Sequence, residues 1–400
     1  MTADVSVGRL ANPHDALAAA QRLQPRISAR AADHDKAGIF PEADFSDLRG
    51  HGLLGLMVPT RLGGPGCGFA DYVEVAMALA AANGATALVF NMHASITGAL
   101  AGTPDDLARM LGVPESYFAA RDRILGGARD GLFYAVAMSE RGAGSRLSKI
   151  TTTYEPIDSG YHLEGSKTFV SGAGFADAYL LAAKSRIADP PEVSHFLVPA
   201  GDGLTVEQTW DSLGMRATGS QDLHIDVDVP SDTLIGGLEG LTLLLAQIMP
   251  QWLVASYAAV YVGVARSAID AAIAHLNERN LSGLPAVRAR IGRADASVAA
   301  AQLVVREAAR RIDSAPGEAE TNQWVYRAKL VAGQTAMEVA ASMLEAAGTS
   351  ATRRGNPLER IYRDARCGSL QPATSDVCAD WLGVAALGLD PDADAATPRW

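Results

Sequence analysis

One block of the chain differs from everything around it and limits the folds that the chain can adopt. Residues 131–235 form short, partly alternating runs rich in β-branched and aromatic residues, such as "YHLEGSKTFV" and "DLHIDVDVP". Gly, Asp or Pro separates these runs, which is typical of an antiparallel sheet or a small barrel. Ala- and Leu-rich segments with helical spacing flank the block on both sides. The order helices, strands, helices predicts an α+β fold with segregated layers.

These changes divide the chain into three parts. We expect an N-terminal helical domain over residues 1–130, a middle β domain over 131–235 and a C-terminal helical domain over 236–400. A chain of 400 residues is long enough for two or three domains with a large core. No fixed internal period appears, which excludes a repeat architecture.

Charge and cysteine content narrow the function classes. The net charge of −11 argues against a general nucleic-acid binder, which is normally basic on at least one face. The 3 cysteines have no disulfide or zinc spacing, so no metal site is expected and a reducing, cytoplasmic location suits them. The N-terminus lacks the charged-then-apolar pattern of a signal peptide. The most apolar segment, residues 240–265, contains Gln247, Pro250 and Gln251, so we expect a buried core helix and no membrane span.

Five segments follow one another in a recognisable order. They are "LMVPTRLGGPGCGFADYVEVAMALA" (56–80), "YAVAMSERGAGS" (134–145), "YHLEGSKTFVSGAGFADAYLLAAKS" (161–185), "LGMRATGSQDLHIDVDVP" (213–230) and "PLERIYRDAR" (357–366). Together they resemble the acyl-CoA dehydrogenase superfamily of flavoproteins from about residue 15 to residue 385. The resemblance implies an N-terminal helical domain, a middle antiparallel β barrel and a C-terminal four-helix bundle. It also implies a flavin between barrel and bundle and a homotetramer or homodimer, because a neighbouring subunit completes the cofactor site in this family.

The resemblance places the flavin against one turn, one strand end and one loop, through Met138, Ser139, Gly144, Ser145, Phe169, Ser171 and Gln371. In "AMSERGAGS", backbone N–H groups and the hydroxyls of Ser139 and Ser145 can donate hydrogen bonds to the flavin carbonyls or to its phosphates. Such donors stabilise the negative charge that builds on the ring upon reduction. Phe169 is expected to pack against the ring, and Ser171 to point at its N5 edge.

Three residues of the helical C-terminal part are implied in a partner subunit's cofactor site. Arg279 lies where the family directs an arginine toward the flavin diphosphate, although a helix-end arginine also complements the helix dipole. Gly348 belongs to the small-residue turn that approaches the adenosine of FAD in the family. Glu345 stands where many relatives have Gln, which weakens the case for FAD. FAD is therefore the expected cofactor, with FMN as the alternative.

Other residues are candidates for substrate contacts. His93, in "VFNMHASITG", is either a satisfied core residue or a proton carrier in contact with substrate. Arg141 and Arg146 replace the family's usual Pro and Asp. They are either solvated turn residues or positive charges where a phosphate docks, with Arg146 then contacting substrate. Leu253 is expected in the substrate wall.

The usual catalytic base is absent from the sequence. Dehydrogenation of an acyl thioester needs a carboxylate to take the α proton while the flavin takes a hydride. At the family's spacing this position falls on Pro372, and a second position used by some relatives falls near Leu253. Neither residue accepts a proton. A flavin site without a carboxylate suits chemistry in which reduced flavin reacts with oxygen.

We therefore expect a flavin monooxygenase-type enzyme of secondary metabolism, acting on a small organic molecule or on a thioester of CoA or a carrier protein. A flavin reductase or an acyl-carrier protein would be its partner. One alternative is an acyl-CoA dehydrogenase whose base has moved to Asp376, His93 or Glu140, although Asp376 also suits the first turn of a helix. The other is a flavin- or acyl-carrier-binding scaffold without turnover.

Overall fold

The computed structural model describes residues 7–144, 146–189 and 192–389, so the expected flavin contact Ser145 lies outside the described residues. The N-terminal part is helical as expected: α1 (Pro13–Ala37), α2 (Glu42–Gly50), α3 (Phe69–Ala82), α4 (Gly84–Gly102), α5 (Asp105–Met110) and α6 (Glu115–Arg129). The side chain of Asn83 starts α4 by accepting a hydrogen bond from the Ala85 N–H group. Because α4 is buried along almost its whole length, it fixes the wall that faces the middle domain.

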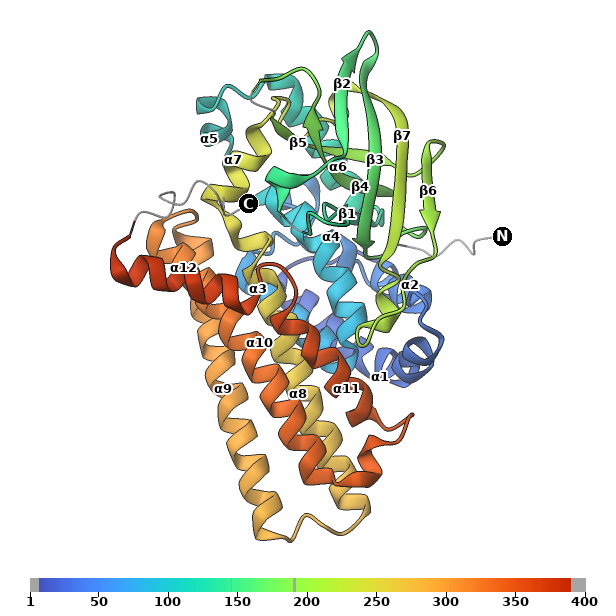
Figure 1. Ribbon diagram of the computed structural model, residues 1–400, viewed down its shortest axis with the longest axis vertical. Helices are drawn as coiled ribbons and strands as arrows, with labels where there is room; N and C mark the ends of the chain where they lie inside the picture. Colours follow the sequence, from blue (N-terminus) through green and yellow to red (C-terminus); the bar gives the residue numbers. More distant parts are fainter. Residues whose placement is uncertain (1–6, 145, 190–191, 390–400) are drawn as a thin grey trace.

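Seven strands form one curled sheet above the helical bundle (Figure 1). They are β1 (Tyr134–Ala137), β2 (Thr153–Ile157), β3 (Gly160–Val170), β4 (Ala178–Ser185), β5 (Val193–Pro199), β6 (Leu204–Glu207) and β7 (Gln221–Pro230). The order is β1-β4-β2-β3-β7-β6, with β5 paired to β4. Most strand pairs are antiparallel as expected, but β4 runs parallel to β1 and to β2. The connections between these pairs cross over, which strand patterns alone do not reveal.

The C-terminal part contains α7 (Leu241–Ile248), α8 (Ala255–Glu278), α9 (Pro285–Ser314), α10 (Ala319–Ala347), α11 (Pro357–Arg366) and α12 (Ser375–Leu387). The long helices α8, α9 and α10 pack on one another, and α11 lies against α8 and α10 (Figure 1). The stretch Pro250–Glu278 is long and apolar enough to cross a membrane, yet 78% of its most apolar window is buried inside the molecule. That burial is typical of a core helix.

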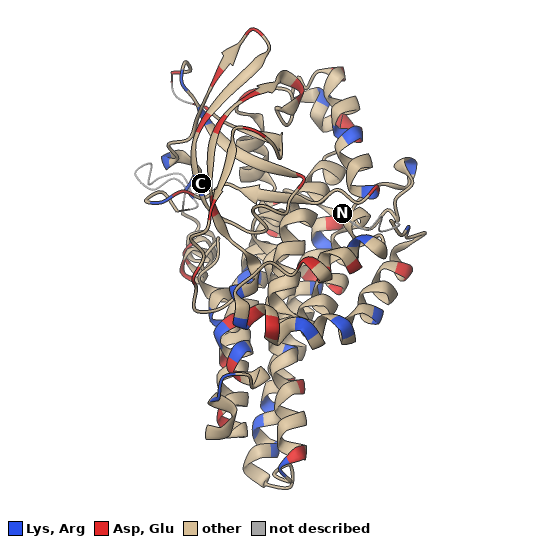
Figure 2. Cartoon of the chain, turned by 90° about the vertical axis from the view of Figure 1, so that its right-hand side faces the viewer, with Lys and Arg blue, Asp and Glu red and all other residues tan. Residues whose placement is uncertain are grey.

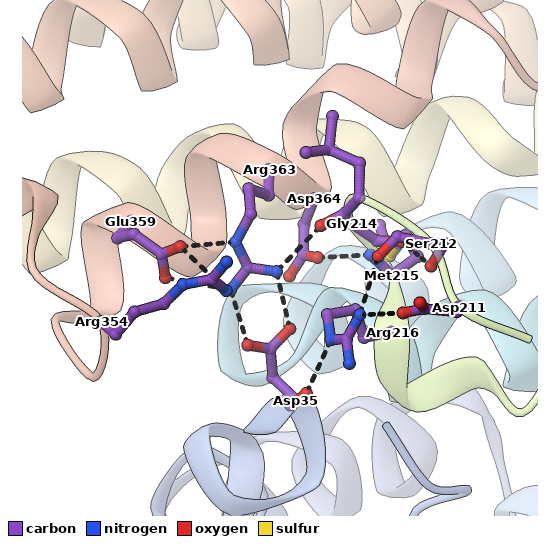
Figure 3. Close-up of polar contacts among 11 residues, drawn as sticks. Asp35, Asp211, Ser212, Gly214, Met215, Arg216, Arg354, Glu359, Arg363 and Asp364 are labelled. Carbon is purple, nitrogen blue, oxygen red and sulfur yellow. Dashed lines mark hydrogen bonds and ion pairs between the residues drawn. The ribbon is translucent and has the colours of Figure 1, made fainter. Parts of the chain in front are cut away.

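A polar network joins the three parts of the chain (Figure 3). The Arg363 guanidinium on α11 binds both carboxylate oxygens of Asp35 at 2.6 and 3.0 Å, and it also pairs with Glu359. Arg216 donates to the Asp35 carbonyl oxygen at 3.1 Å. The neighbouring Asp364 carboxylate accepts the Met215 N–H at 2.6 Å. Arg363 thus connects α11 to α1, and Asp364 connects α11 to the segment before β7.

Acidic and basic residues are interspersed along the helices of the lower part of the molecule (Figure 2). Arg306 pairs with Glu74 at 2.6 Å, which connects α9 to α3. On α9 itself, Arg311 pairs with Glu307 at 2.6 Å. Such exposed pairs contribute little to stability, so the burial of apolar side chains between the helices holds the bundle together.

Candidate flavin site

A cavity of about 570 Å³ lies between the sheet and the bundle, and we call it the central cavity. Its walls come from α4, β1, the turn after β1, the end of β3, residues 210–220, α8 and the loop before α12. The lining residues are Leu88, Met92, Val136, Met138, Ser139, Gly144, Leu147, Phe169, Ser171, Trp210, Met215, Thr218, Ser220, Leu253, Tyr257, Cys367, Leu370, Gln371, Pro372 and Thr374. The structure thus brings together the predicted contacts Met138, Ser139, Gly144, Phe169, Ser171, Gln371 and Leu253.

The turn after β1 is closed by its own hydrogen bonds. The Gly144 N–H donates to the Glu140 carbonyl at 2.9 Å, and the Glu140 N–H donates to the Gly144 carbonyl at 3.1 Å. The Thr168 N–H also donates to the Ser139 carbonyl at 2.9 Å, which attaches the turn to β3. The Gly144 N–H is therefore already engaged within the turn. The side chain of Ser139 lines the cavity instead.

A buried ion pair supports this turn from below. Lys167 Nζ lies 2.7 Å from Glu140 Oε1, and the two side chains are 0% and 3% exposed. The Glu140 carboxylate also accepts hydrogen bonds from the N–H groups of Thr151 and Thr152. Burial opposes ionisation, but the Lys167 charge and these hydrogen bonds lower the pKa of Glu140 to about 2. Glu140 is therefore a structural anion and a poor candidate for a relocated base.

The end of β3 is strained where it meets the cavity. Phe169 has φ of +58°, which is uncommon for an aromatic residue, and the pairing of β3 with β7 shifts register between Lys167 and Val170. Although apolar, the Phe169 side chain is 60% exposed, and its ring meets Trp210 edge-on at 6.0 Å. The backbone thus holds an uncovered aromatic ring in the cavity wall, where a planar ligand can stack on it.

Three hydroxyl groups lie in a row beside Phe169. Ser171 Oγ is 2.8 Å from Ser220 Oγ, which is 2.6 Å from Thr218 Oγ1. Thr218 donates to the Met215 carbonyl at 2.9 Å. Since each hydroxyl can both donate and accept, Ser171 retains hydrogen-bonding capacity toward the cavity.

A buried lysine fixes the wall that carries the usual base position. Lys329 Nζ on α10 donates to the carbonyl oxygens of Gly368, Gln371 and Ala373 at 2.8, 3.0 and 3.0 Å. Burial lowers the pKa of Lys329 to about 8, so the ammonium is still protonated at neutral pH. The Tyr261 hydroxyl donates to Gln371 Oε1 at 2.7 Å. Together these contacts hold Gln371 and Pro372 against the central cavity.

The described residues that line the central cavity offer no acid or base for proton transfer near neutral pH. Among the described residues that line it, none is Asp, Glu, His, Lys or Arg. The Tyr257 and Cys367 side chains ionise only in strongly alkaline solution, because burial raises the pKa of each to about 12. Pro372 and Leu253 stand in the walls as expected.

A second and larger hollow of about 1050 Å³, the outer cavity, shares Gly144, Phe169, Trp210, Ser220, Pro372 and Thr374 with the central cavity. Arg146 and Asp376 line it and are exposed. Arg141 is engaged by Asp222 at 2.6 Å. Asp376 lies in the first turn of α12, which the Thr374 side chain caps by accepting the Val377 N–H. Asp376 thus lines the outer cavity, as Pro372 does, and is not among the described residues that line the central cavity.

His93 is not part of the central cavity wall, which corrects the expected contact with substrate. Its Nε2 donates to the Leu54 carbonyl at 2.7 Å, and its Nδ1 accepts the Tyr134 N–H at 3.1 Å. Both ring nitrogens are thus occupied by the backbone, and only 1% of the residue is exposed. Burial lowers the pKa of His93 to about 4, so the imidazole is neutral at physiological pH. It positions β1 against α4.

Arg279, Glu345 and Gly348 lie at the opposite end of the bundle from the sheet, where α8 and α10 end (Figure 1). None of them lines the central cavity. Arg279 is exposed, and Glu345 pairs with Arg290 at 2.6 Å. Their expected contacts belong to a partner subunit's cofactor and stay a prediction.

The central cavity fits a flavin ring. Its volume lies within the roughly 300–1,000 Å³ of small-molecule sites. The uncovered Phe169 ring gives a stacking surface, and the Ser171 hydroxyl gives a buried polar group beside it.

Known proteins share this architecture over nearly the whole chain. The models of the acyl-CoA dehydrogenase N-terminal, middle and C-terminal domains match residues 16–112, 135–227 and 255–374. L-evernosamine nitrososynthase of Micromonospora is 30% identical over 94% of this chain and 90% of that protein. The structure of KijD3 with FMN and an amino-keto-sugar nucleotide has a TM-score of 0.83, 28% identity and 98% coverage of both chains. The dibenzothiophene monooxygenase TdsC of Paenibacillus, with FMN and indole, has a TM-score of 0.81, 26% identity and coverage of 94% and 97%.

The fold and the central cavity define a class, the flavin-dependent oxidoreductases. The chain belongs to the acyl-CoA dehydrogenase family. The predicted α+β fold and the flavin class of cofactor are confirmed, and the two structural neighbours contain FMN, the alternative that the sequence had left open.

Several residues of the site were missed by sequence reasoning. Trp210, Thr218, Ser220 and Tyr257 line the central cavity, and Lys329 supports it. One signal was present for Lys167: strand alternation places it on the same face as the buried Leu163. A lysine on that face needs a buried partner.

Proposed function

We propose that this chain is an FMN-dependent monooxygenase of secondary metabolism that oxidises a nitrogen, a sulfur or an aromatic carbon of a small organic substrate. The observation that carries the proposal is a flavin-sized cavity whose described walls hold no carboxylate, imidazole or amine. The nitrososynthase and the dibenzothiophene monooxygenase support it, because both are oxidising enzymes of the same fold.

A bound flavin would supply the redox chemistry with oxygen, and the residues of the chain supply its surroundings. The apolar side chains Leu88, Met92 and Val136 exclude water from the central cavity, which protects reactive oxygen chemistry from hydrolysis. Phe169 would hold the ring by stacking, and the Ser171 hydroxyl would hold it by a hydrogen bond. No group of the described walls removes a proton from carbon, so acyl dehydrogenation lacks its first requirement.

The preference for FMN over FAD follows from charges outside the central cavity. Glu345 stands where many relatives have Gln, and its carboxylate pairs with Arg290 at 2.6 Å, so the amide contact that those relatives offer to FAD would be missing. Arg146 lies in the outer cavity with its positive charge exposed, where it suits the single phosphate of FMN. The proposal also includes a flavin reductase as partner, a cytoplasmic location, a homotetramer or homodimer, and a division into three domains at residues 130 and 235.

Two reactions of the FMN-loaded protein test this function. Anaerobic addition of butyryl-CoA should leave the flavin oxidised, whereas a flavin reductase with NADH should reduce it. Admission of isotope-labelled oxygen with indole, dibenzothiophene or phenol should then place one labelled atom in a product. Bleaching by butyryl-CoA alone would establish the dehydrogenase alternative, and failure to oxygenate any of the three compounds would overturn the monooxygenase.

A further inference from the structure

Lys329 on α10 is a buried positive charge that no carboxylate of the described residues neutralises. Its side chain is 0% exposed, and the three groups that accept its hydrogen bonds are neutral main-chain carbonyl oxygens. Lys167, a second buried lysine, pairs with Glu140 at 2.7 Å instead. Buried charges are normally paired, because burial without a counter-ion costs free energy. The unpaired ammonium of Lys329 therefore points to an anion that the chain itself does not supply.

The ammonium lies directly behind the wall of the central cavity. Lys329 Nζ is 3.0 Å from the carbonyl oxygen of Gln371 and 6.0 Å from the centroid of the Tyr257 ring. Both Gln371 and Tyr257 line the central cavity. A single layer of residues thus separates the charge from the space where the flavin ring fits. Because this layer is part of the protein interior, water and salt screen the charge weakly.

The charges around the cavity do not cancel that of Lys329. None of the described residues that line the central cavity is Asp or Glu. The buried carboxylate of α11 belongs to Asp364. Burial raises the pKa of Asp364 to about 6, and the charges of Arg360 and Arg363 oppose that shift. Its negative charge is thus offset by two cations of its own helix.

The charge states of the lysine and the flavin decide what the ammonium can do. Burial lowers the pKa of Lys329 to about 8, so most of it is protonated at neutral pH. An oxidised flavin ring is neutral, and the uptake of two electrons and one proton gives it one negative charge. At an effective dielectric constant of about 20, a unit charge roughly 10 Å away shifts such an equilibrium about tenfold.

We propose that Lys329 stabilises the negatively charged reduced flavin relative to the neutral oxidised flavin, acting through the wall formed by Gln371 and Tyr257. Lys329 is a positioning residue, since it places a charge and holds a loop without touching the ring. The inference rests on flavin binding in the central cavity. It holds whether the reduced flavin then reacts with oxygen or with another acceptor, so it does not depend on the proposed monooxygenase function.

The affinities of the protein for the two redox forms of FMN measure this effect. Dissociation constants are obtained by titration with oxidised FMN and, without oxygen, with FMN reduced by dithionite. The phosphate charge is the same in both forms and cancels in their ratio. We expect the wild type to bind reduced FMN at least about tenfold more tightly than oxidised FMN. For a two-electron couple, tenfold corresponds to a midpoint potential about 30 mV above that of free FMN.

Three variants separate the charge from the support of the loop. Lys329→Gln keeps amide N–H donors but has no charge, so the preference for reduced FMN should fall about tenfold. Lys329→Arg keeps the charge and should retain the preference. Tyr261→Phe is the matched control, because it removes the hydroxyl that donates to Gln371 Oε1 at 2.7 Å and changes no charge. It should weaken binding of both redox forms equally and leave the ratio unchanged.

The outcomes distinguish this inference from the flavin site and from the proposed function. Equal binding of both forms by the wild type, or an unchanged ratio in Lys329→Gln, would overturn the electrostatic role and leave Lys329 as a support for the loop. An equal fall in Tyr261→Phe would overturn it too. If Lys329→Gln fails to fold, the ratio in the wild type decides alone. A wild type that binds neither form would overturn the flavin site, whereas bleaching by butyryl-CoA would overturn only the monooxygenase.

Discussion

Replacing Lys167 with methionine removes one half of the buried ion pair beneath the flavin turn. The substitution deletes a contact of 2.7 Å to Glu140 between side chains that are 0% and 3% exposed. The Glu140 carboxylate then stays in place with hydrogen bonds from the Thr151 N–H and hydroxyl at 2.6 and 2.7 Å and from the Thr152 N–H at 3.0 Å. It has lost its only charged partner among the described contacts of that carboxylate.

The burial of the pair sets the size of the effect. Burial alone would raise the pKa of Glu140, but Lys167 and the hydrogen bonds lower it from 4.5 to about 2, whereas burial lowers the pKa of Lys167 from 10.5 to about 8. The two shifts act on stability in opposite directions. The contribution of Glu140 is present above pH 4.5 and is lost as the pH falls toward 2. Breaking a buried pair by removing one partner costs about 3–5 kcal/mol, so we expect Lys167→Met to lower the free energy of unfolding by about 3 kcal/mol at neutral pH.

Urea unfolding followed by circular dichroism measures this loss. In Lys167→Met the Glu140 carboxyl group should stay protonated to a higher pH than in the wild type. The loss of unfolding free energy relative to the wild type should therefore grow between about pH 5 and about pH 8. The double variant Glu140→Gln/Lys167→Met buries no charge and should recover part of the stability. Arg109→Met, which breaks the exposed pair with Glu115, should cost at most about 1 kcal/mol. A Lys167→Met deficit under about 1 kcal/mol, or a double variant no more stable than the single one, would refute the reasoning.

Two further substitutions probe the loop before α12. Lys329→Met should lower the free energy of unfolding by at least about 3 kcal/mol, because three buried carbonyl oxygens lose their donor. It should also weaken FMN affinity, because Gln371 is no longer held in place. Urea unfolding measures the first effect, and flavin titration measures the second. Asp376→Asn should change stability by no more than about 0.5 kcal/mol and leave oxygenation intact, because Asp376 is exposed in the first turn of α12. If butyryl-CoA bleached the flavin in the wild type but not in Asp376→Asn, the dehydrogenase alternative with Asp376 as its base would be correct.

The family resemblance predicted the parts of the site that are continuous in the chain. Met138, Ser139, Phe169 and Ser171 meet in one cavity, and each pair lies at the end of a strand that alternation and glycine make recognisable. The absent base was readable from the family's spacing, which falls on Pro372 shortly after α11.

The rest depends on contacts between segments far apart in the chain. Lys329 lies in an Ala-rich helix, and its three carbonyl acceptors come from a loop about forty residues later, which no spacing rule connects. The bond between Arg363 and Asp35 likewise spans 328 positions. The parallel pairing of β4 was missed for the same reason, because strand composition does not specify the direction of a neighbour.

Three titratable groups near the central cavity are engaged in structural contacts. His93 has both ring nitrogens bound to the backbone, Glu140 is neutralised by Lys167, and the Asp364 carboxylate accepts the Met215 N–H. Each of these groups would serve as a base in a different setting, but here each joins two segments of the chain. A site that used proton abstraction would need one of them free and facing the flavin. Because structural contacts occupy all three, the reaction must draw its driving force from the reduced cofactor and oxygen, and selectivity must come from the shape and hydrogen bonding of the cavities.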